Sequence, residues 1–376
     1  MSPAWREIRV ERTRFLIIIA GLAFIQLAAM GMIGFYRGIV RDMLVVADGI
    51  GADLWVVQGG RIGPFAEISV LPALLDRRAE AIPGVQLARR FIQFPRMIDV
   101  HDASMRVAIT GLDFPKDRGA WIPLMAGRPL MAGHHEVIAD WRTGLAIGDH
   151  VRLGRDDYRV VGVSLDQVDI TFSPVLFVSI ADALDIGSAV PSEAVLLGRA
   201  GSRQPQTYDI SAVLLTMSEA ADPGFVQAQI NRWPDVSVVS QQQQRSWIVD
   251  DMLGPLRQQI LYFVCLLLGV TGTILGLTMH NTVLQKTHFI ALIKMLGASD
   301  LYVARFILTQ ALAIIVTSFV LALLIAVVFF PHFPRSVILR PADMAWLGAA
   351  LVGVCGLSSA AGIHKALQIP ARAVLG

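Results

Sequence analysis

The segment "GHHEVIAD", residues 133–140, brings together three side chains that can bind a metal ion: His134, His135 and Glu136. Imidazole nitrogens and carboxylate oxygens are common zinc ligands. Adjacent residues of an extended segment point to opposite faces, so His134 and His135 cannot share an ion unless the chain bends. We therefore predict a polar turn that leads into a strand, and no metal-binding residue.

Nucleotide hydrolysis would require a glycine-rich phosphate loop followed by Lys and then Ser or Thr. None of the lysines follows a glycine: Lys116, Lys286, Lys294 and Lys365. No Ser-His-Asp set or paired carboxylates stand out either. The chain is predicted to have no catalytic residue and no cofactor of its own, which disfavours a membrane-anchored enzyme.

The segment "LQKTHFIALIKMLGASD", residues 284–300, is predicted to form a two-sided helix. Phe289, Leu292, Ile293 and Leu296 follow the i, i+3, i+4, i+7 spacing of one apolar helical face. The segment also carries His288, and Lys286 and Lys294 are expected to flank the apolar face on its wetter side. Gly297 is suited to end the helix and Ser299 to cap the next one. From the residues alone, a connector lying at the membrane interface is favoured over a contact helix for another protein.

The composition indicates a membrane protein, because 54% of the residues are hydrophobic and only 16% are charged. Four apolar runs have the roughly 20 residues that a helix needs to cross a bilayer. The first run is too long for a signal peptide, so a retained span is favoured over a cleaved leader. The predicted order is a cytoplasmic N-terminal segment (1–14), span one (15–35), an exported domain (36–259), span two (260–279), a cytoplasmic coupling-helix loop (280–307), span three (308–330), a periplasmic loop (331–344), span four (345–363) and a cytoplasmic tail (364–376).

Lysines and arginines near the spans place both termini in the cytoplasm. The exported segment has short β-rich runs separated by Gly, Pro and Asp, with two helical stretches between them, which predicts an α+β domain. Its "QQQQ" run, residues 241–244, is expected on an exposed surface leading to the second span. The net charge of +2 comes from dispersed basic residues, so nucleic acid is not an expected partner.

Polar and small residues inside the spans most often serve helix packing. Gln26 and Gln310 are the better candidates for substrate or dimer contacts. Gly269, Gly272 and Gly276 share one side of the second span, which favours a tight interface and makes a contact between two permeases a further candidate. The span centres lack Asp, Glu, Lys and Arg, which argues against an ion-coupled carrier.

Three motifs of this chain resemble those of the permease subunits of MacB/FtsX-type ABC transporters, the mechanotransmission class. "HFIALIKMLGAS" (288–299) is similar to the family's cytoplasmic signature, residues 126–163 resemble its periplasmic core motif, and "IPARAVLG" (369–376) resembles its C-terminal ending. Tyr302 and Gln310 add a likeness to DevC-like and haem-exporter-like branches. The family commonly has Glu where this chain has Phe289.

The resemblance implies a four-span permease in the bacterial inner membrane with a MacB-like periplasmic domain. It implies two copies of a separate ATPase that binds ATP and Mg, a second permease copy in a homodimer, and in some systems a periplasmic adaptor and outer-membrane channel. The implied activity is ATP-driven export or extraction of an amphiphile; the alternative is an FtsX-like regulator of a periplasmic cell-wall hydrolase. The ATPase would then contact Lys286, His288, Phe289, Leu292, Ile293, Lys294, Leu296, Gly297 and Ser299.

Overall fold

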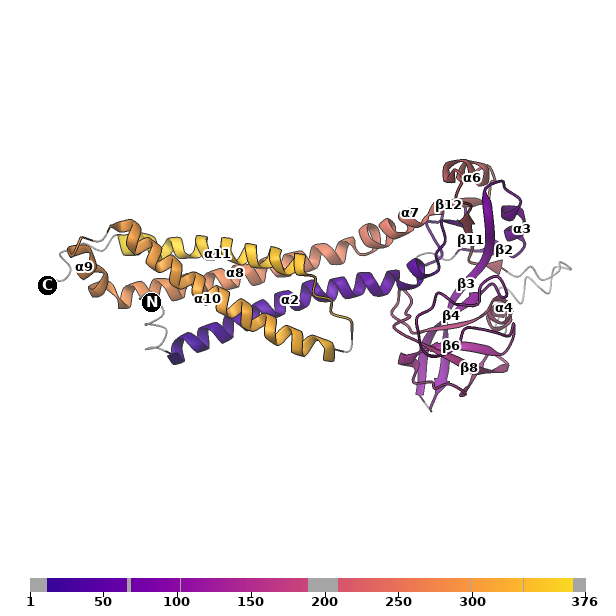
Figure 1. Cartoon of the computed structure of the whole chain (residues 1–376), viewed down its shortest axis with the longest axis horizontal. Coiled ribbons are helices and arrows are strands. Elements are labelled where there is room, and N and C mark those ends of the chain that lie inside the picture. The colour runs from indigo at the N-terminus through magenta and orange to yellow at the C-terminus, as the bar shows by residue number, and fades with distance from the viewer. Residues whose placement is uncertain are drawn as a thin grey trace, which may run out of the picture. The chain divides into compact units, whose positions relative to one another are not determined.

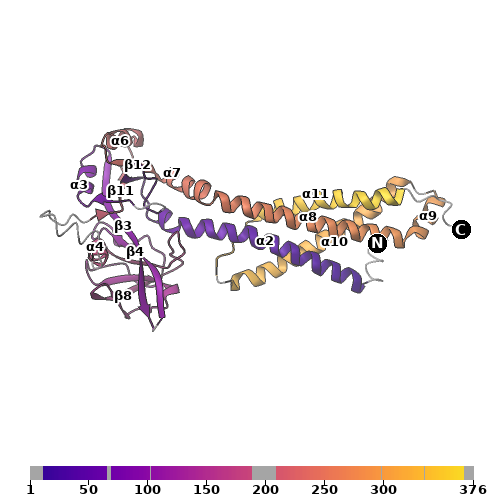
Figure 2. The same ribbon diagram turned by 180° about the vertical axis from the view of Figure 1, so that it is seen from behind.

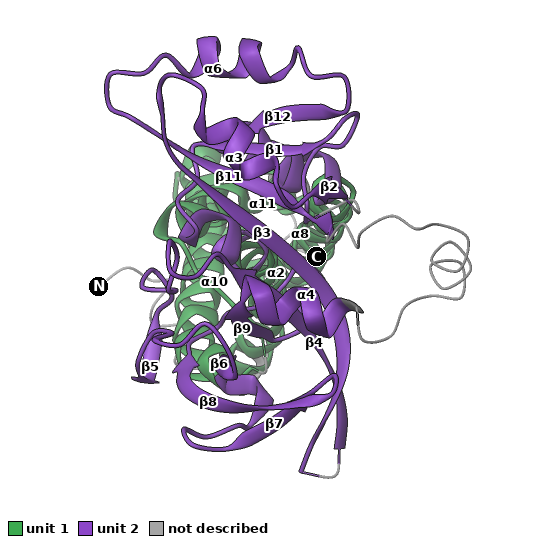
Figure 3. Ribbon diagram, turned by 90° about the vertical axis from the view of Figure 1, so that its right-hand side faces the viewer, with its two compact units in different colours: residues 1–39, 254–376 green, residues 40–253 purple. Residues whose placement is uncertain are grey.

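The computed structural model describes residues 12–65, 69–101, 103–188, 209–297, 299–333 and 335–367. The predicted N-terminal segment up to residue 11 and the tail from residue 368 lie outside these residues. The chain divides into two compact units, shown in Figure 3: unit 1 comprises Met1–Ile39 and Gly254–Gly376, and unit 2 comprises Val40–Leu253.

Four helices are long and apolar enough to cross a membrane. They are α2 (Arg12–Gly49), α8 (Gly254–Gln285), α10 (Asp300–Phe329) and α11 (Pro341–Leu367). A short helix, α9 (Thr287–Met295), and a 3₁₀ turn, η3 (Phe330–His332), complete unit 1. Each of these four helices is longer than its predicted apolar run, because backbone hydrogen bonding does not stop where the hydrocarbon layer ends.

Within unit 1, α8 and α11 lie side by side in both Figure 1 and Figure 2. Gly272 faces α11 closely, since a Cβ atom placed on it would lie 2.9 Å from Val354 Cγ1 and 3.0 Å from Ser358 Oγ. Small residues allow such close approach of helices in lipid.

The chain between η3 and α11 packs on α2 through glycines. The amide of Ile338 donates to the Gly34 carbonyl at 3.0 Å, and a Cβ atom on Gly38 would overlap the Ser336 carbonyl oxygen. Next to this loop, Arg37 of α2 and Asp343 of α11 form two parallel hydrogen bonds, each of 2.8 Å. The small residues of α2 therefore admit an extended loop, and the backbone of that loop takes the place of a neighbouring helix.

Unit 2 is built on a mixed sheet ordered β12-β1-β11-β3-β4-β9-β6-β8-β5, with β7 paired to β8 and a separate pair β10-β2 (Figure 1). Only β4–β9 and β6–β8 are parallel pairs. The strands are β1 (Leu54–Gln58), β2 (Leu71–Pro72), β3 (Val85–Val100), β4 (Ala103–Leu112), β5 (Leu124–Gly127), β6 (Glu136–Asp140), β7 (His150–Leu153), β8 (Asp156–Ser164), β9 (Val175–Ser179), β10 (Asp209–Ile210), β11 (Ala212–Met217) and β12 (Val236–Ser240).

Strand β3 is long enough to join two halves of this sheet. Its first half pairs with β11 and its second half with β4. At the junction Phe91 packs edge-to-face on Trp55 and Phe65, with ring centroids 5.8 and 5.7 Å apart. Because Trp55 and Phe91 are almost completely buried, this cluster forms the centre of the core.

Helices α3 (Leu75–Glu80), α4 (Ile180–Ser188), α6 (Pro223–Ile230) and α7 (Gln241–Ser246) and the turn η1 (Trp141–Thr143) lie between the strands, in agreement with the α+β prediction. A π-helical segment, Trp247–Met252, follows α7. The expectation that "QQQQ" lies on an exposed surface holds for Gln242 and Gln243 but not for Gln244. Ser240 and Gln243 form a capping box that starts α7, and Gln244 is buried.

We predict that Gly38→Ala lowers the stability of the protein by about 1–3 kcal/mol, the usual cost of overpacking a filled site. Gly21→Ala is the matched control, because it lies on the same helix with nothing within 4 Å of its Cβ position. Thermal unfolding in detergent, followed by tryptophan fluorescence, should show a lower Tm for the Gly38 variant only. Equal Tm values would contradict the close packing of the Ser336 backbone on Gly38.

Candidate functional site

The predicted two-sided helix is present as α9, between α8 and α10. Its end and the start of α10 have the predicted capping. Gly297 adopts a left-handed conformation with φ of +92°, and the Ser299 side chain accepts a hydrogen bond from the Tyr302 amide. Lys286 precedes the first helical residue, Thr287.

The predicted apolar face of α9 is left largely uncovered by the chain. Phe289 is 43% exposed, Leu292 42% and Leu296 81%, whereas the helix buries Ile290 and Ala291. Between α9 and the start of α10 lies a cavity of about 60 Å³, lined by Phe289, Ile290, Ile293, Tyr302, Val303 and Phe306. A cavity of this size admits several water-sized groups, and its lining is almost entirely apolar. Val303 and Phe306 were not singled out from the sequence, because they belong to the next helix.

The two lysines of this region differ in their surroundings. The expectation that Lys294 lies on the wetter side is wrong. Its side chain is 12% exposed, and its Nζ atom pairs with Asp300 at 3.0 Å and donates to the Ala366 carbonyl at 3.3 Å. The ammonium thus satisfies a carbonyl in the last turn of α11. Lys286 is half-buried, with Nζ 6.0 Å from the Phe306 ring centre, and His288 is exposed.

The two intramembrane glutamines are both buried. Gln26 donates through Nε2 to Ser318 Oγ on α10 at 3.0 Å, while its Oε1 atom has no partner. Gln310 also buries its Nε2 atom without a partner. The Gln26 side chain therefore packs α2 against α10 within one chain, and its role as a substrate or dimer contact stays a prediction. Gln310 stays a candidate contact residue.

The three glycines of α8 do not act as one surface. Gly272 and Gly276 pack on Ser358 of α11 in the same chain, whereas Gly269 has nothing within 4 Å of its Cβ position. The close neighbours of Gly272 and Gly276 belong to this chain, and a contact of these glycines with a second permease copy stays a prediction. Sequence spacing identified the close packing but not the partner helix.

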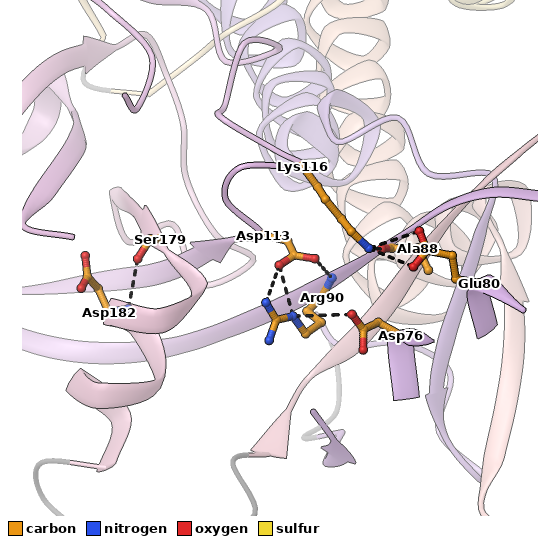
Figure 4. A network of polar contacts seen from close by, with 8 residues as sticks. All are labelled: Asp76, Glu80, Ala88, Arg90, Asp113, Lys116, Ser179 and Asp182. Carbon is orange, nitrogen blue, oxygen red and sulfur yellow. Dashed lines mark hydrogen bonds and ion pairs between the residues drawn. The ribbon is translucent and has the colours of Figure 1, made fainter. Parts of the chain in front are cut away.

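In unit 2, ion pairs join α3, β3 and the chain after β4 (Figure 4). Arg90 donates to Asp113 through two side-chain nitrogens at 3.1 and 2.7 Å and approaches Asp76 at 3.8 Å. Lys116 pairs with Glu80 and also donates to the Ala88 carbonyl at 2.9 Å. These contacts tie α3 and the chain after β4 to β3 in the middle of the sheet.

The His-His-Glu segment makes separate contacts, as its turn-and-strand interpretation predicts. His134 Nδ1 lies 2.8 Å from Asp182 Oδ1, and the His135 amide donates to the other oxygen of Asp182. Glu136 instead pairs with Arg128. In the described part of the chain, no group of three or more His, Cys, Asp or Glu side chains could hold a metal ion.

A buried arginine holds the end of α2. Arg89 on β3 donates to Asp117 Oδ2 at 2.8 Å and to the Ile50 carbonyl, just past the end of α2, at 2.9 Å. Asp117 also accepts from Trp121 Nε1, and the Trp121 ring lies against Gly49. The guanidinium thus places a positive charge at a helix C-terminus, where the helix dipole favours it.

A second contact of α2 lies at the ends of β6 and β8. Asp166 accepts hydrogen bonds from Arg41 of α2 at 3.3 Å, from Arg142 at 3.1 Å and from Trp141 Nε1 at 3.1 Å. Next to it, Asp140 is fully buried and accepts from the Arg142 and Gln167 amides. Burial raises the pKa of Asp140 to about 6, although these amides act in the opposite direction.

Comparison with known proteins identifies the family. A model of the MacB-like periplasmic core domain matches residues 15–233, and a model of the FtsX-like permease C-terminal matches residues 261–371. The chain belongs to the MacB/FtsX-type ABC transporter permeases. The permease is therefore a membrane protein with an extracytoplasmic domain.

Several known proteins are similar to this chain. An uncharacterized ABC transporter permease of Mycobacterium tuberculosis, Rv0072, is 22% identical over 380 residues, covering 100% of this chain and 99% of that protein. A second one, Rv2563, is 20% identical over 379 residues with the same coverage. The periplasmic region of MacB from Actinobacillus actinomycetemcomitans matches with 13% identity and a TM-score of 0.40, covering 53% of this chain and 94% of that structure. The extracellular domain of YknZ from Gram-positive bacteria matches with 11% identity and a TM-score of 0.35, covering 50% and 100%.

We predict that Asp117→Asn destabilises the permease by about 3–5 kcal/mol, because it leaves the buried Arg89 charge without its carboxylate. Glu80→Gln is the control, since its pair with Lys116 is partly exposed and should contribute no more than about 1 kcal/mol. Chemical denaturation in detergent, followed by tryptophan fluorescence, measures both losses. Losses of equal size would show that Arg89 does not depend on Asp117.

Asp140 should make stability fall as pH rises. Its folded pKa of about 6 is above its unfolded value of about 4, so between these pH values the folded state holds a proton that the unfolded state has lost. The free energy of unfolding then decreases by up to about 3 kcal/mol from pH 4 to pH 6. Thermal unfolding of wild type and Asp140→Asn over this range should show a smaller decrease for the variant. Parallel curves would contradict the raised pKa.

Proposed function

We propose that this permease couples ATP hydrolysis by a separate ATPase to movement of its extracytoplasmic domain. The observation that carries the proposal is α9, a short helix between two spans that leaves Phe289, Leu292 and Leu296 exposed. Exposed apolar residues gathered on one short helix mark a protein interaction site. Membership among ABC transporter permeases implies an ATPase as that partner.

The contacts of α9 with neighbouring helices provide a route for transmitting force from the ATPase. Its buried residues Ile290 and Ala291 and the Lys294 contacts with Asp300 and Ala366 connect it to the starts and ends of neighbouring helices. A force on α9 would therefore reach α10 and α11 through packed side chains and would not be lost in a loose connection. In a homodimer, two permeases and two ATPases would act together.

The movement would serve export or extraction of an amphiphilic substrate. Two features are consistent with this: the span centres carry no ionisable residue for ion coupling, and α2 continues from the apolar span into unit 2 as one helix. The ATPase would supply the bound ATP and Mg. The permease would supply the moving extracytoplasmic domain, inserted in the bacterial inner membrane.

The contact role of α9 is tested with Leu292→Asp and Leu296→Asp in the full-length permease. Each is expected to weaken co-purification with the partner ATPase by at least about tenfold, because a carboxylate would be buried in an apolar interface. ATP turnover of the complex should lose its dependence on the permease. Phe225→Asp is the control, since Phe225 is a comparably exposed apolar residue (47%) in unit 2 and should leave both properties unchanged. Unaltered association of the α9 variants would refute the contact.

A further inference from the structure

The cavity between α9 and the start of α10 has a buried floor and an exposed rim. Ile290 and Val303, which form its floor, are 5% and 4% exposed. Phe289 of α9 and Tyr302 of α10 also line it, and these two side chains are 43% and 52% exposed. The cavity therefore opens between two partly exposed aromatic rings, where another molecule can reach it.

The lining of this cavity suits an apolar group. The lining residues are aliphatic or aromatic, and the phenol of Tyr302 carries their one polar side-chain atom. A water molecule in a cavity needs two to four polar partners, which this lining does not offer. An apolar group needs no hydrogen bond and gains dispersion contacts with the surrounding side chains. The volume of about 60 Å³ has room for about four or five heavy atoms.

The α10 wall of the cavity precedes the apolar run 308–330. Val303 lies five residues before Leu308, which is about 7.5 Å along a helix that rises 1.5 Å per residue. The same two turns of α10 carry Asp300 and Arg305, and both side chains are exposed. Because charged side chains avoid the hydrocarbon layer, this end of α10 lies outside it. The acyl chains of the lipid are therefore not the expected occupant of the cavity.

We propose that the cavity receives an apolar side chain of the ATPase, inserted between Phe289 and Tyr302. This inference rests on the proposed function, in which α9 contacts the ATPase, and it adds which kind of residue the ATPase presents there. Leu292 and Leu296 lie on the same face of α9 as Phe289 and are 42% and 81% exposed, so the cavity continues the proposed contact surface. The end of a Leu, Ile or Met side chain has the size that the cavity admits.

An inserted side chain would also explain how the ATPase acts on two helices at once. The cavity walls come from both α9 and α10, since Phe289 and Ile293 belong to the first and Val303 and Phe306 to the second. A side chain seated between them contacts α10 directly, without α9 as an intermediate. Displacement of the ATPase would then move α10 together with α9, because closely packed groups transmit strain.

The first test fills the cavity from its floor with Val303→Phe in the full-length permease. Its association with the ATPase that co-purifies with the wild-type permease is expected to weaken by about tenfold, the change that corresponds to losing the burial of one aliphatic side chain. Val320→Phe is the matched control, because it makes the same change in size at a position of α10 that is 49% exposed and does not line the cavity. Thermal unfolding of each variant, followed by tryptophan fluorescence, reports whether the permease remains folded.

The second test leaves the cavity unfilled. The photo-crosslinker p-benzoylphenylalanine replaces Tyr302, the complex is irradiated, and mass spectrometry locates the cross-linked residue. We expect an aliphatic residue, a methionine or an aromatic residue of the ATPase. The same crosslinker in place of Val320 is the control and should give no cross-link to the ATPase. Because this test does not depend on Val303→Phe, it decides the question even where the filled cavity lowers the Tm.

Two results would overturn the proposal: normal association of a folded Val303→Phe variant, or cross-links from position 302 that reach only lipid, a second permease copy or polar residues of the ATPase. Leu292→Asp and Leu296→Asp separate this failure from that of the proposed function. If they weaken association and Val303→Phe does not, α9 contacts the ATPase without an inserted side chain. If none of the three weakens it, the ATPase contact of α9 fails as well.

Discussion

The buried guanidinium of Arg89 is the contact on which the arrangement of unit 2 depends. It joins the carbonyl after the end of α2 to Asp117 and, through Asp117, to Trp121. A charge in this position is stable only when every partner is in place, because a buried ion without its counterion costs several kcal/mol.

The remaining contacts of α2 within unit 2 repeat this principle with weaker, more exposed pairs. Arg41 meets Asp166, and Asp48 accepts from Gln241 and Arg245 at the start of α7. Gln241 also accepts from Trp55 Nε1, so one side chain links α2, the central tryptophan and the segment that leads toward α8. Surface pairs contribute little stability individually. Their value here is that they join the incoming and outgoing ends of the domain directly.

In unit 1 the apolar helices pack through small residues, and the Arg37–Asp343 ion pair lies outside the apolar run of α2. Glycines admit close neighbours on two helices: Gly34 and Gly38 admit an extended loop, and Gly272 and Gly276 admit α11. In lipid, association of helices relies on such close packing, because burying apolar surface brings no gain when the solvent is itself apolar. The Arg37–Asp343 pair stands just past the apolar run, where two parallel hydrogen bonds can form between fully charged groups.

Sequence reasoning predicted the local features of this protein well. The four apolar helices, the α9 helix with Gly297 and Ser299 at its end and the strand-and-turn role of residues 133–140 depend on composition and short spacings. Strands β1, β3, β4, β6, β7 and β8 were likewise visible as short β-rich runs, whereas β9, β11, β12 and α4 were not singled out.

Only the tertiary structure decided which distant groups meet. It placed Lys294 against Asp300 and Ala366, paired Gln26 with Ser318, set the α8 glycines on α11 and buried Arg89 with Asp117. It also brought Met125 of β5 to the sheet end where Trp141 follows β6 and Leu165 follows β8. Spacing along a chain reports neighbours within one helix or strand, because that periodicity is fixed by the backbone. Contacts between elements depend on strand order, register and helix packing, which no single segment of the sequence encodes.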